Sequence, residues 1–206
     1  MNNDYKKRVS IDSQNLNWQE DKILNIFQKV LSQSDIKQTA LIKIDENSTL
    51  SNSNRINSVE IYVLEGTYIN EFGTHFQGTY LKLPKEQESL VSSTEGCTIY
   101  RKTNYYENDE QSIVDTKHTP WSAGYGNLQV MSLSDQTALV KWPKDERFIP
   151  HSHWGGEEIL VLSGVFMDEL GKYEVGNWTR SPHQSRHFPY VKDETVILVK
   201  TGHLFE

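Results

Sequence analysis

Four residues in the C-terminal half of the chain have the types and the spacing of a metal-binding set. They are His151, His153, Glu157 and His187. Three imidazoles and one carboxylate form a ligand set that Zn²⁺ and other divalent transition metals accept, and one or two coordination positions stay open for water or a substrate. The alternative hypothesis is that these histidines are satisfied core residues of an ordinary barrel strand.

The sequence around these residues predicts how they meet. His151 and His153 are two positions apart, so on a β-strand both point to the same face. Two glycines then turn the chain, and Glu157 begins an apolar run, residues 159–162, that is typical of a buried strand. His187 comes from a later strand. Three strands that lie close together can therefore bring all four side chains to one place.

The stretch from His151 to His187 resembles a known motif. It reads HSHWGGEEILVLSGVFMDELGKYEVGNWTRSPHQSRH. The spacing H-x-H-x3-E-x6-G at its start resembles the first motif of the cupin superfamily. The segment from Gly176 to His187 resembles the second, although Gln184 stands where that motif usually has glycine. The whole stretch is similar, without a gap, to the cupin domains of ChrR-type regulators, whose pattern is HxHxGGEExLVLxGxFxDExGxYxxGxWxRxPxxSxH.

This resemblance implies a small antiparallel β-sandwich, or jelly roll, in which inward-facing side chains converge at the mouth of a barrel. It implies one divalent metal per chain, held by His151, His153, Glu157 and His187. The ChrR resemblance favours zinc. Iron, manganese, nickel and copper stay open, because ligand type alone does not select the metal.

An internal repeat organises the chain. With an offset of 98 residues, Glu60-Ile-Tyr-Val-Leu-Glu-Gly66 falls on Glu158-Ile-Leu-Val-Leu-Ser-Gly164. Trp18 and Trp121 head the two copies. We therefore predict an all-β bicupin with two tandem antiparallel modules: a degenerate module without metal ligands at residues 14–106, and a metal-binding module at residues 118–206.

The first copy keeps the scaffold but not the ligands. At the positions of the four candidate ligands it carries Ser53, Arg55, Val59 and Ser89. None of these is a good ligand for a transition metal in that place, and Arg55 would repel one. We expect one metal per chain, in the second module, and a packing role for the first.

The repeat also decides a local ambiguity. Residues 17–34 alone look helical, with apolar side chains on one face. The equivalent residues 127–133 alternate like a strand. Because equivalent repeats fold alike, we predict a strand near residues 26–34 and leave open a short helix at residues 17–24.

Bulk properties exclude several classes of protein. The 206 residues carry a net charge of −7 and no basic cluster, which excludes a nucleic-acid-binding surface. No apolar stretch approaches the ~18 residues of a membrane span, and no signal-peptide core begins the chain. The one cysteine, Cys97, has no partner for an internal disulfide and aligns with Thr195, which predicts a small packing residue. We expect a cytoplasmic protein.

Partner expectations follow from the resemblance. ChrR-type anti-sigma factors carry an N-terminal zinc-binding helical domain with paired cysteines. The residues before Trp18 are few and the chain has no CxxC pair, so sigma-factor binding through that interface is not expected. A homodimer paired through strand edges is expected, and the open metal position is compatible with a small-molecule ligand.

Other residues near the candidate ligands are not predicted to bind the metal. Glu158 and Arg180 match Glu60 and Lys82 of the metal-free copy, so we assign them to the fold. His183 is either a partner of the site or an exposed loop residue. Some aromatic residues of the second copy are expected to line an apolar pocket, and the others to be core or rim; they are Trp142, Phe148, Trp154, Phe166, Tyr173, Trp178 and Tyr190.

Three functions stay open from the sequence. The first is a sensor or regulatory module with a zinc site. The second is a metal-dependent dioxygenase that acts on a small diketone or hydroxy-ketone, and the third is a structural protein with a vestigial site. No separate general base is evident, so catalytic residues are unassigned and enzyme status is left open. An apolar pocket with an open metal position favours the enzyme, and a closed four-coordinate zinc favours the sensor.

Overall fold

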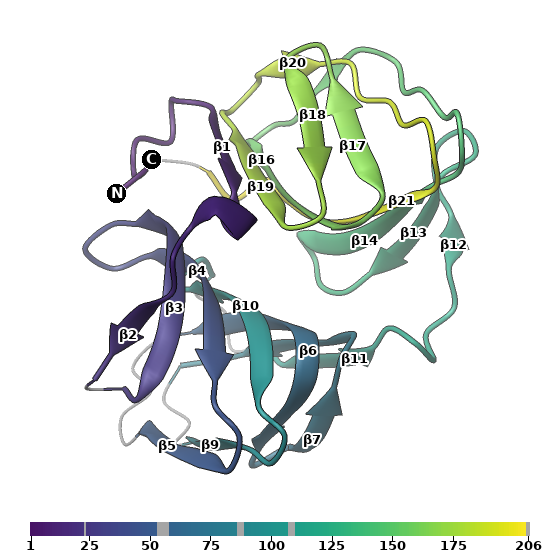
Figure 1. Ribbon diagram of the computed structural model, residues 1–206. Helices are drawn as coiled ribbons and strands as arrows, with labels where there is room; N and C mark the ends of the chain where they lie inside the picture. Colours follow the sequence, from purple (N-terminus) through teal and green to yellow (C-terminus); the bar gives the residue numbers. More distant parts are fainter. Residues whose placement is uncertain (23, 53–57, 86–88, 107–109, 205–206) are drawn as a thin grey trace. The chain divides into compact units, whose positions relative to one another are not determined.

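A computed structural model describes residues 1–22, 24–52, 58–85, 89–106 and 110–204, and its sheets are antiparallel throughout. Contacts divide the chain into two units (Figure 1). One contains Met1 and residues 17–119, and the other contains residues 2–16 and 120–206. The predicted all-β bicupin architecture is confirmed. Within the described residues, no helix has the length and apolar character that a membrane span needs.

The first unit is a sheet in the order β11-β8-β6-β10-β4-β3-β2, with β5, β7 and β9 completing the barrel beside the distal half of β6. Its strands are β2 (Gln19–Asp21), β3 (Ile26–Gln33), β4 (Gln38–Ile44), β5 (Ser48–Asn52), β6 (Val59–Asn70), β7 (Gly73–Phe76), β8 (Thr79–Leu83), β9 (Ser89–Ser93), β10 (Cys97–Thr103) and β11 (Ser112–Asp115).

The second unit repeats this order as β1-β19-β16-β21-β14-β13-β12, with a separate two-stranded sheet β15-β20 and the hairpin β17-β18. Its elements are β1 (Val9–Asp12), the 3-10 turn η1 (Ser13–Asn15), β12 (Ser122–Ala123), β13 (Gln129–Ser132), β14 (Thr137–Trp142), β15 (His151–Ser152), β16 (Glu157–Ser163), β17 (Val165–Asp168), β18 (Gly171–Glu174), β19 (Asn177–Ser181), β20 (Arg186–His187) and β21 (Thr195–Thr201).

A glycine bends each module at the same place. Gly66 has φ of +75° and Gly164 has φ of +74°, a left-handed conformation that glycine adopts without strain. A Cβ on Gly66 would meet the carbonyl oxygen of Gly96 at 2.0 Å, and one on Gly164 would meet that of Glu194 at 2.4 Å. The turn glycines that the repeat retains are therefore required where the chain leaves the main sheet for the second layer.

Each module has its own apolar core between the layers. In the first unit it consists of inward-facing residues of the strands, among them Ile42, Ile61, Leu81 and Ile99. In the second unit the equivalent cluster is built around aromatic residues, with Trp142, Phe166 and Tyr173 beside Ile159 and Ile197. Inward-facing side chains form these cores, and central strands such as β4 and β8 are buried on both faces.

The edge strands reveal a part of the repeat that the sequence comparison missed. In the second unit β1 pairs with β19 from Val9↔Arg180 to Asp12↔Asn177. In the first unit β11 pairs with β8 from Ser112↔Lys82 to Asp115↔Thr79. Because Arg180 and Lys82 are equivalent, β1 and β11 occupy the same place. Each module is thus completed by a strand that precedes the other copy in the sequence.

The local prediction for residues 17–34 is borne out for its main part. Residues Ile26–Gln33 form β3, as the repeat indicated. The short helix left open at residues 17–24 is absent among the described residues, where β2 occupies Gln19–Asp21 and the 3-10 turn lies earlier, at Ser13–Asn15. Pairing of β2 with β3 satisfies its backbone groups and overrides the helical pattern.

Candidate metal centre

The structure brings the four predicted residues together at one end of the second module. His151 on β15 lies directly opposite His187 on β20 in an antiparallel pair. Their Nε2 atoms are 3.1 Å apart, and the Nε2 atoms of His151 and His153 are 2.9 Å apart. Glu157, the first residue of β16, places Oε1 at 3.2 Å from Nε2 of His153 and Oε2 at 3.6 Å from Nε2 of His187.

These separations fit one shared metal ion. Two ligand atoms that lie about 2.1 Å from the same ion at angles of about 90–110° are about 3.0–3.4 Å apart. The three histidines form a group whose donor atoms all lie within 4.8 Å of one another. Oε2 of the buried Glu157 has no hydrogen bond to any described residue, which leaves a carboxylate oxygen aimed at the cluster. The donor set therefore suits a divalent cation.

One backbone contact prepares His151 as a ligand. Nδ1 of His151 lies 3.0 Å from the carbonyl oxygen of Ile149. A carbonyl oxygen only accepts hydrogen bonds, so this contact places the proton on Nδ1 and leaves the Nε2 lone pair free. Nε2 is the atom that faces His153 and His187.

Burial controls the charges at the cluster. It raises the pKa of Glu157 to about 8, while Arg8 acts to lower that pKa and Asp168 acts to raise it. Burial also lowers the pKa of His153 to about 4, with a contribution from His151. The pKa of His187 falls to about 3 because of burial and the two neighbouring imidazoles. Both histidines are therefore neutral at pH 7, which is the form that binds a metal.

The loops around the ligands are tightly fixed. Gly156 has φ of +72°, and a Cβ there would meet the carbonyl oxygen of Ser181 at 2.8 Å. The exposed His183 accepts a hydrogen bond at Nδ1 from the N–H of Gly155, at 2.8 Å. Gln184, at the position where glycine is usual, has φ of +59°, which gives the physical reason for that preference. His183 is thus an exposed loop residue that also holds the turn before Glu157.

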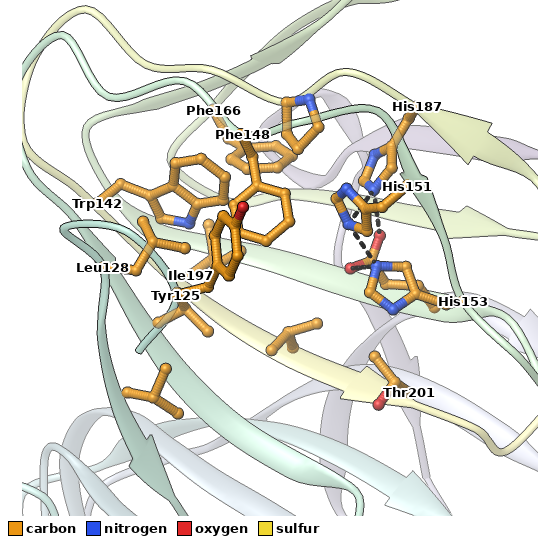
Figure 2. Close-up of a pocket in the computed structure, with 15 residues that line it drawn as sticks. Tyr125, Leu128, Trp142, Phe148, His151, His153, Phe166, His187, Ile197 and Thr201 are labelled. Carbon is orange, nitrogen blue, oxygen red and sulfur yellow. Dashed lines mark hydrogen bonds and ion pairs between the residues drawn. The ribbon is translucent and has the colours of Figure 1, made fainter. Parts of the chain in front are cut away.

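An apolar cavity of about 210 Å³ adjoins the cluster. Figure 2 shows the three imidazoles on one side of this pocket and Trp142, Phe148 and Phe166 on the other. Among the described residues that line it, the ligands carry the ionisable groups near the metal position, and the remaining wall is predominantly apolar. That wall consists of Tyr125, Leu128, Val130, Val140, Trp142, Phe148, Phe166, Pro189, Ile197, Val199 and Thr201.

The aromatic predictions divide as expected. Trp142, Phe148 and Phe166 line the cavity, with Trp142 and Phe166 in edge-to-face contact at 5.4 Å between ring centroids. Trp154 is exposed, whereas Trp178 is buried elsewhere in the module. Tyr125 was missed by the sequence analysis. Its ring lies 4.9 Å from that of Phe148, and the turn before β13 that carries it gave no motif signal.

Glu158 and Arg180 lie outside the cavity. Glu158 is buried on β16, opposite Arg180 on β19 and Lys200 on β21. In the first module Glu60 is placed opposite Lys82 and Lys102 in the same way. The same cross-strand arrangement occurs in a module without the metal residues, which supports the structural role assigned to both.

The equivalent place in the first module is only partly described. Ser53 and Arg55 lie outside the described residues, and only the backbone of Ser89 is described, in β9. Val59, at the position of Glu157, is buried in the apolar core of that module. The position that holds a carboxylate in the second module thus holds an aliphatic side chain in the first.

Comparison with known proteins identifies the family. The model of the ChrR Cupin-like domain matches twice, at residues 6–107 and 109–205. The chain therefore belongs to the ChrR cupin-like domain family, with two copies in tandem. No curated protein sequence matches the chain.

Solved structures with the same fold are distant in sequence. A proposed dioxygenase of Nostoc punctiforme PCC 73102 is 13% identical, with a TM-score of 0.80 over 95% of this chain and 82% of that one. Protein Ylba of E. coli is 14% identical, with a TM-score of 0.71 over 97% and 92%. Salicylate 1,2-dioxygenase of Pseudoaminobacter salicylatoxidans, solved as adducts with gentisate, is 6% identical, with a TM-score of 0.66 over 96% and 81%. These likenesses show the cupin fold.

Proposed function

We propose that the second module binds one divalent metal through His151, His153, Glu157 and His187 and acts as a metal-dependent dioxygenase on a small, uncharged molecule such as a diketone or hydroxy-ketone. The observation that carries the proposal is the apolar cavity of about 210 Å³ beside the four donors. A site that served only to hold the fold together would have no need of a cavity beside its metal, whereas a small-molecule site has this form.

The chain's own residues have defined tasks in this proposal. Iron or manganese would supply redox chemistry with dioxygen and an electrophilic position for a chelating pair of substrate oxygens. The three imidazoles and Glu157 would hold the ion at the cavity wall. Phe148 and Phe166 exclude water from the bound molecule.

A second candidate function is a regulatory module whose zinc site responds to a small molecule or an oxidant. Membership of the ChrR cupin-like family supports it. In that case the cavity would admit the signal molecule, and zinc would act as a Lewis acid or a structural ion without redox chemistry.

Elemental analysis separates the two candidates. Protein purified without a nickel column would be analysed by plasma mass spectrometry and, after loading with Fe²⁺, tested with small diketones in an oxygen electrode. About one iron or manganese per chain, with substrate-dependent oxygen uptake, would support the dioxygenase. Zinc, with no oxygen uptake after iron loading, would overturn the dioxygenase and leave the regulatory module.

A cavity variant provides the matched control. Val140 lines the pocket but is not a candidate ligand. Val140→Phe should fill the cavity, abolish oxygen uptake and leave the metal content unchanged. Loss of the metal in this variant would show instead that the substitution had disturbed the whole site.

The homodimer and the cytoplasmic location stay predictions. We propose both on the grounds given by the sequence. Light scattering during size-exclusion chromatography measures the first, and fractionation of cells that express the protein measures the second.

A further inference from the structure

The N-terminal arm, residues 2–12, belongs to the metal-bearing module. Its strand β1 extends the sheet beside β19. Residues before β1 are also fixed, because the guanidinium of the fully buried Arg180 donates to the carbonyl oxygens of Asn2 at 2.5 Å and Asp4 at 3.0 Å. The arm thereby places Arg8, the residue immediately before β1, against the hairpin β17-β18.

Arg8 makes two side-chain contacts there. Its Nη2 donates to Oδ2 of Asp168 at 2.5 Å and to the hydroxyl oxygen of Tyr173 at 2.8 Å. The Asp168 side chain is 1% exposed, and that of Arg8 is 23% exposed. A buried carboxylate without a cation nearby is strongly unfavourable, and Arg8 supplies the positive charge that compensates Asp168 inside the module.

Asp168 in turn holds the hairpin turn. Its Oδ1 accepts hydrogen bonds from the N–H of Leu170 at 2.8 Å, the N–H of Gly171 at 3.0 Å and the hydroxyl of Tyr173 at 2.8 Å. Arg8 and Asp168 therefore form a lock that fixes both strands of the hairpin at the turn.

The hairpin holds the segment that follows the ligand His187. Oε2 of Glu169, in the turn, accepts a hydrogen bond from the N–H of Phe188 at 2.8 Å. Met167 and Tyr190 exchange two backbone hydrogen bonds, at 3.1 and 2.9 Å. Bonds on residues 188 and 190 leave little freedom for His187, which immediately precedes them. The same hairpin carries Phe166, a wall of the cavity.

The first module has the same hairpin without the ion pair. Asn70 stands at the position of Asp168, and its Oδ1 accepts from the N–H of Phe72 at 2.9 Å and contacts Nε2 of His75 at 2.8 Å. His75 stands at the position of Tyr173. In the register of β11, the residue at the position of Arg8 is the exposed Gln111. A neutral pair thus holds this turn where the metal residues are lacking, and the ion pair is present where they are found.

We infer that Arg8 is a positioning residue of the metal centre: from the N-terminal arm it locks the β17-β18 hairpin through Asp168, and the hairpin fixes His187 and the cavity wall. The inference rests on the metal site of the proposed function. The metal site of the second copy therefore needs Arg8, a residue that precedes the first copy in the sequence.

Binding of Co²⁺ alone tests this role, with the affinity measured by competition with a chromophoric chelator and the ligand geometry by the visible spectrum. Removing a cation near a metal should, by charge alone, strengthen binding of that metal. Removing a positioning residue should weaken it. We expect Arg8→Gln to weaken Co²⁺ binding about tenfold or more and to change the visible spectrum, as loss of a group that orients a ligand does.

Three further variants complete the design. Arg8→Gln with Asp168→Asn copies Gln111 and Asn70 of the first module, removes the uncompensated buried charge and should recover most of the lost affinity. Lys172→Gln removes a positive charge from an exposed position of the same hairpin and should leave affinity and spectrum unchanged. If Arg8→Gln fails to fold, Arg8→Lys takes its place, because it keeps the charge but cannot reproduce the guanidinium geometry, and weaker binding is again expected.

Two outcomes would overturn the inference. Unchanged or tighter Co²⁺ binding in Arg8→Gln, whatever its melting temperature, would reduce Arg8 to a stabilising or purely electrostatic residue. Failure of the unaltered protein to bind Co²⁺ would remove the metal centre, and with it the proposed function. Co²⁺ binding by the unaltered protein distinguishes the two failures, because it persists in the first case and is absent in the second.

Discussion

The two modules of this chain share a strand order but differ in where they bury charge. Both keep the bent strand with its glycine, Gly66 in one and Gly164 in the other, and both keep the buried Glu60 or Glu158 opposite two basic residues. They diverge in the barrel interior, where Val59 of the first module faces an apolar core and Glu157 of the second faces three histidines.

This difference separates the requirements of the fold from those of the site. The first module forms its barrel from apolar strand residues, turn glycines and the buried Glu60 with its basic neighbours, and it needs none of the four candidate ligands. The second module adds a carboxylate whose pKa burial raises to about 8 and a hairpin lock of opposite charges. Both additions oppose folding unless a cation or a partner compensates them. Their presence together in one module supports the proposal that this copy holds the metal.

The largest expected effect comes from removing a ligand. His187→Ala should lower metal affinity by more than about a hundredfold, since loss of even a group that orients a ligand costs about 10–100-fold. The barrel should remain folded by circular dichroism, while plasma mass spectrometry shows the loss of metal. The matched control is His118→Ala, which removes an exposed histidine outside the metal-bearing unit and should keep the metal. A His187→Ala protein with full metal content would remove His187 from the ligand set.

Introducing a carboxylate into the first module should break that module rather than convert it. Val59→Glu would bury a charge among aliphatic side chains without the three histidines, and we expect a loss of about 3 kcal/mol or more in the free energy of unfolding. Chemical denaturation measures the loss, and metal content should not rise. The Val59→Gln variant measures how much of the lost unfolding free energy comes from burying a polar group and how much from burying a charge. A stable Val59→Glu protein with two metals per chain would show that the first module is a latent site.

Metal binding should depend on pH through Glu157. At pH 7 most of this carboxyl carries a proton, because burial raises its pKa to about 8, whereas His153 and His187 are already neutral. Apparent Co²⁺ affinity should therefore rise about tenfold per pH unit up to about pH 8 and then level off. In the metal-free protein the effect of pH is the reverse. The folded state holds the Glu157 proton more tightly than the unfolded state, so the stabilisation from this proton is lost as pH rises from 4.5 through about 8.

Cobalt titrations between pH 6 and 8.5 check this dependence. Glu157→Gln serves as the control, because it should bind more weakly and lose the slope. An affinity of the unaltered protein that stays constant between pH 6 and 8 would contradict a protonated Glu157.

The smallest effect is expected at Cys97. This thiol is buried, and burial raises its pKa to about 11. The folded protein should resist alkylation by iodoacetamide at pH 8, because little thiolate is present. Cys97→Thr, which copies Thr195 of the other module, should change the unfolding free energy by less than about 1.5 kcal/mol. Rapid alkylation of the native protein would show that Cys97 is accessible and reactive.

Much of this protein could be predicted from the sequence. The repeat predicted two like modules and a strand near residues 26–34 against their helical pattern, because equivalent segments must bury equivalent faces, and β3 occupies Ile26–Gln33. The H-x-H-x3-E spacing predicted that the four candidate ligands would meet, because strand alternation and a glycine turn fix their directions. Both inferences depend on local geometry that repeats along the chain.

The edge strands and the hairpin lock could not be predicted in this way. No local pattern indicates that β1 pairs with β19, or that Arg8 meets Asp168, 160 residues further along the chain. The cavity likewise depends on Tyr125 and Ile197, which only the closed barrel brings beside the histidines. The repeat, the strands and the candidate ligands can be read from the residues and their spacing. Which distant strand completes each module, which charge compensates Asp168 and what surrounds the ligands depend on the folded chain. These contacts form between segments far apart in the chain, so local spacing and periodicity cannot predict them.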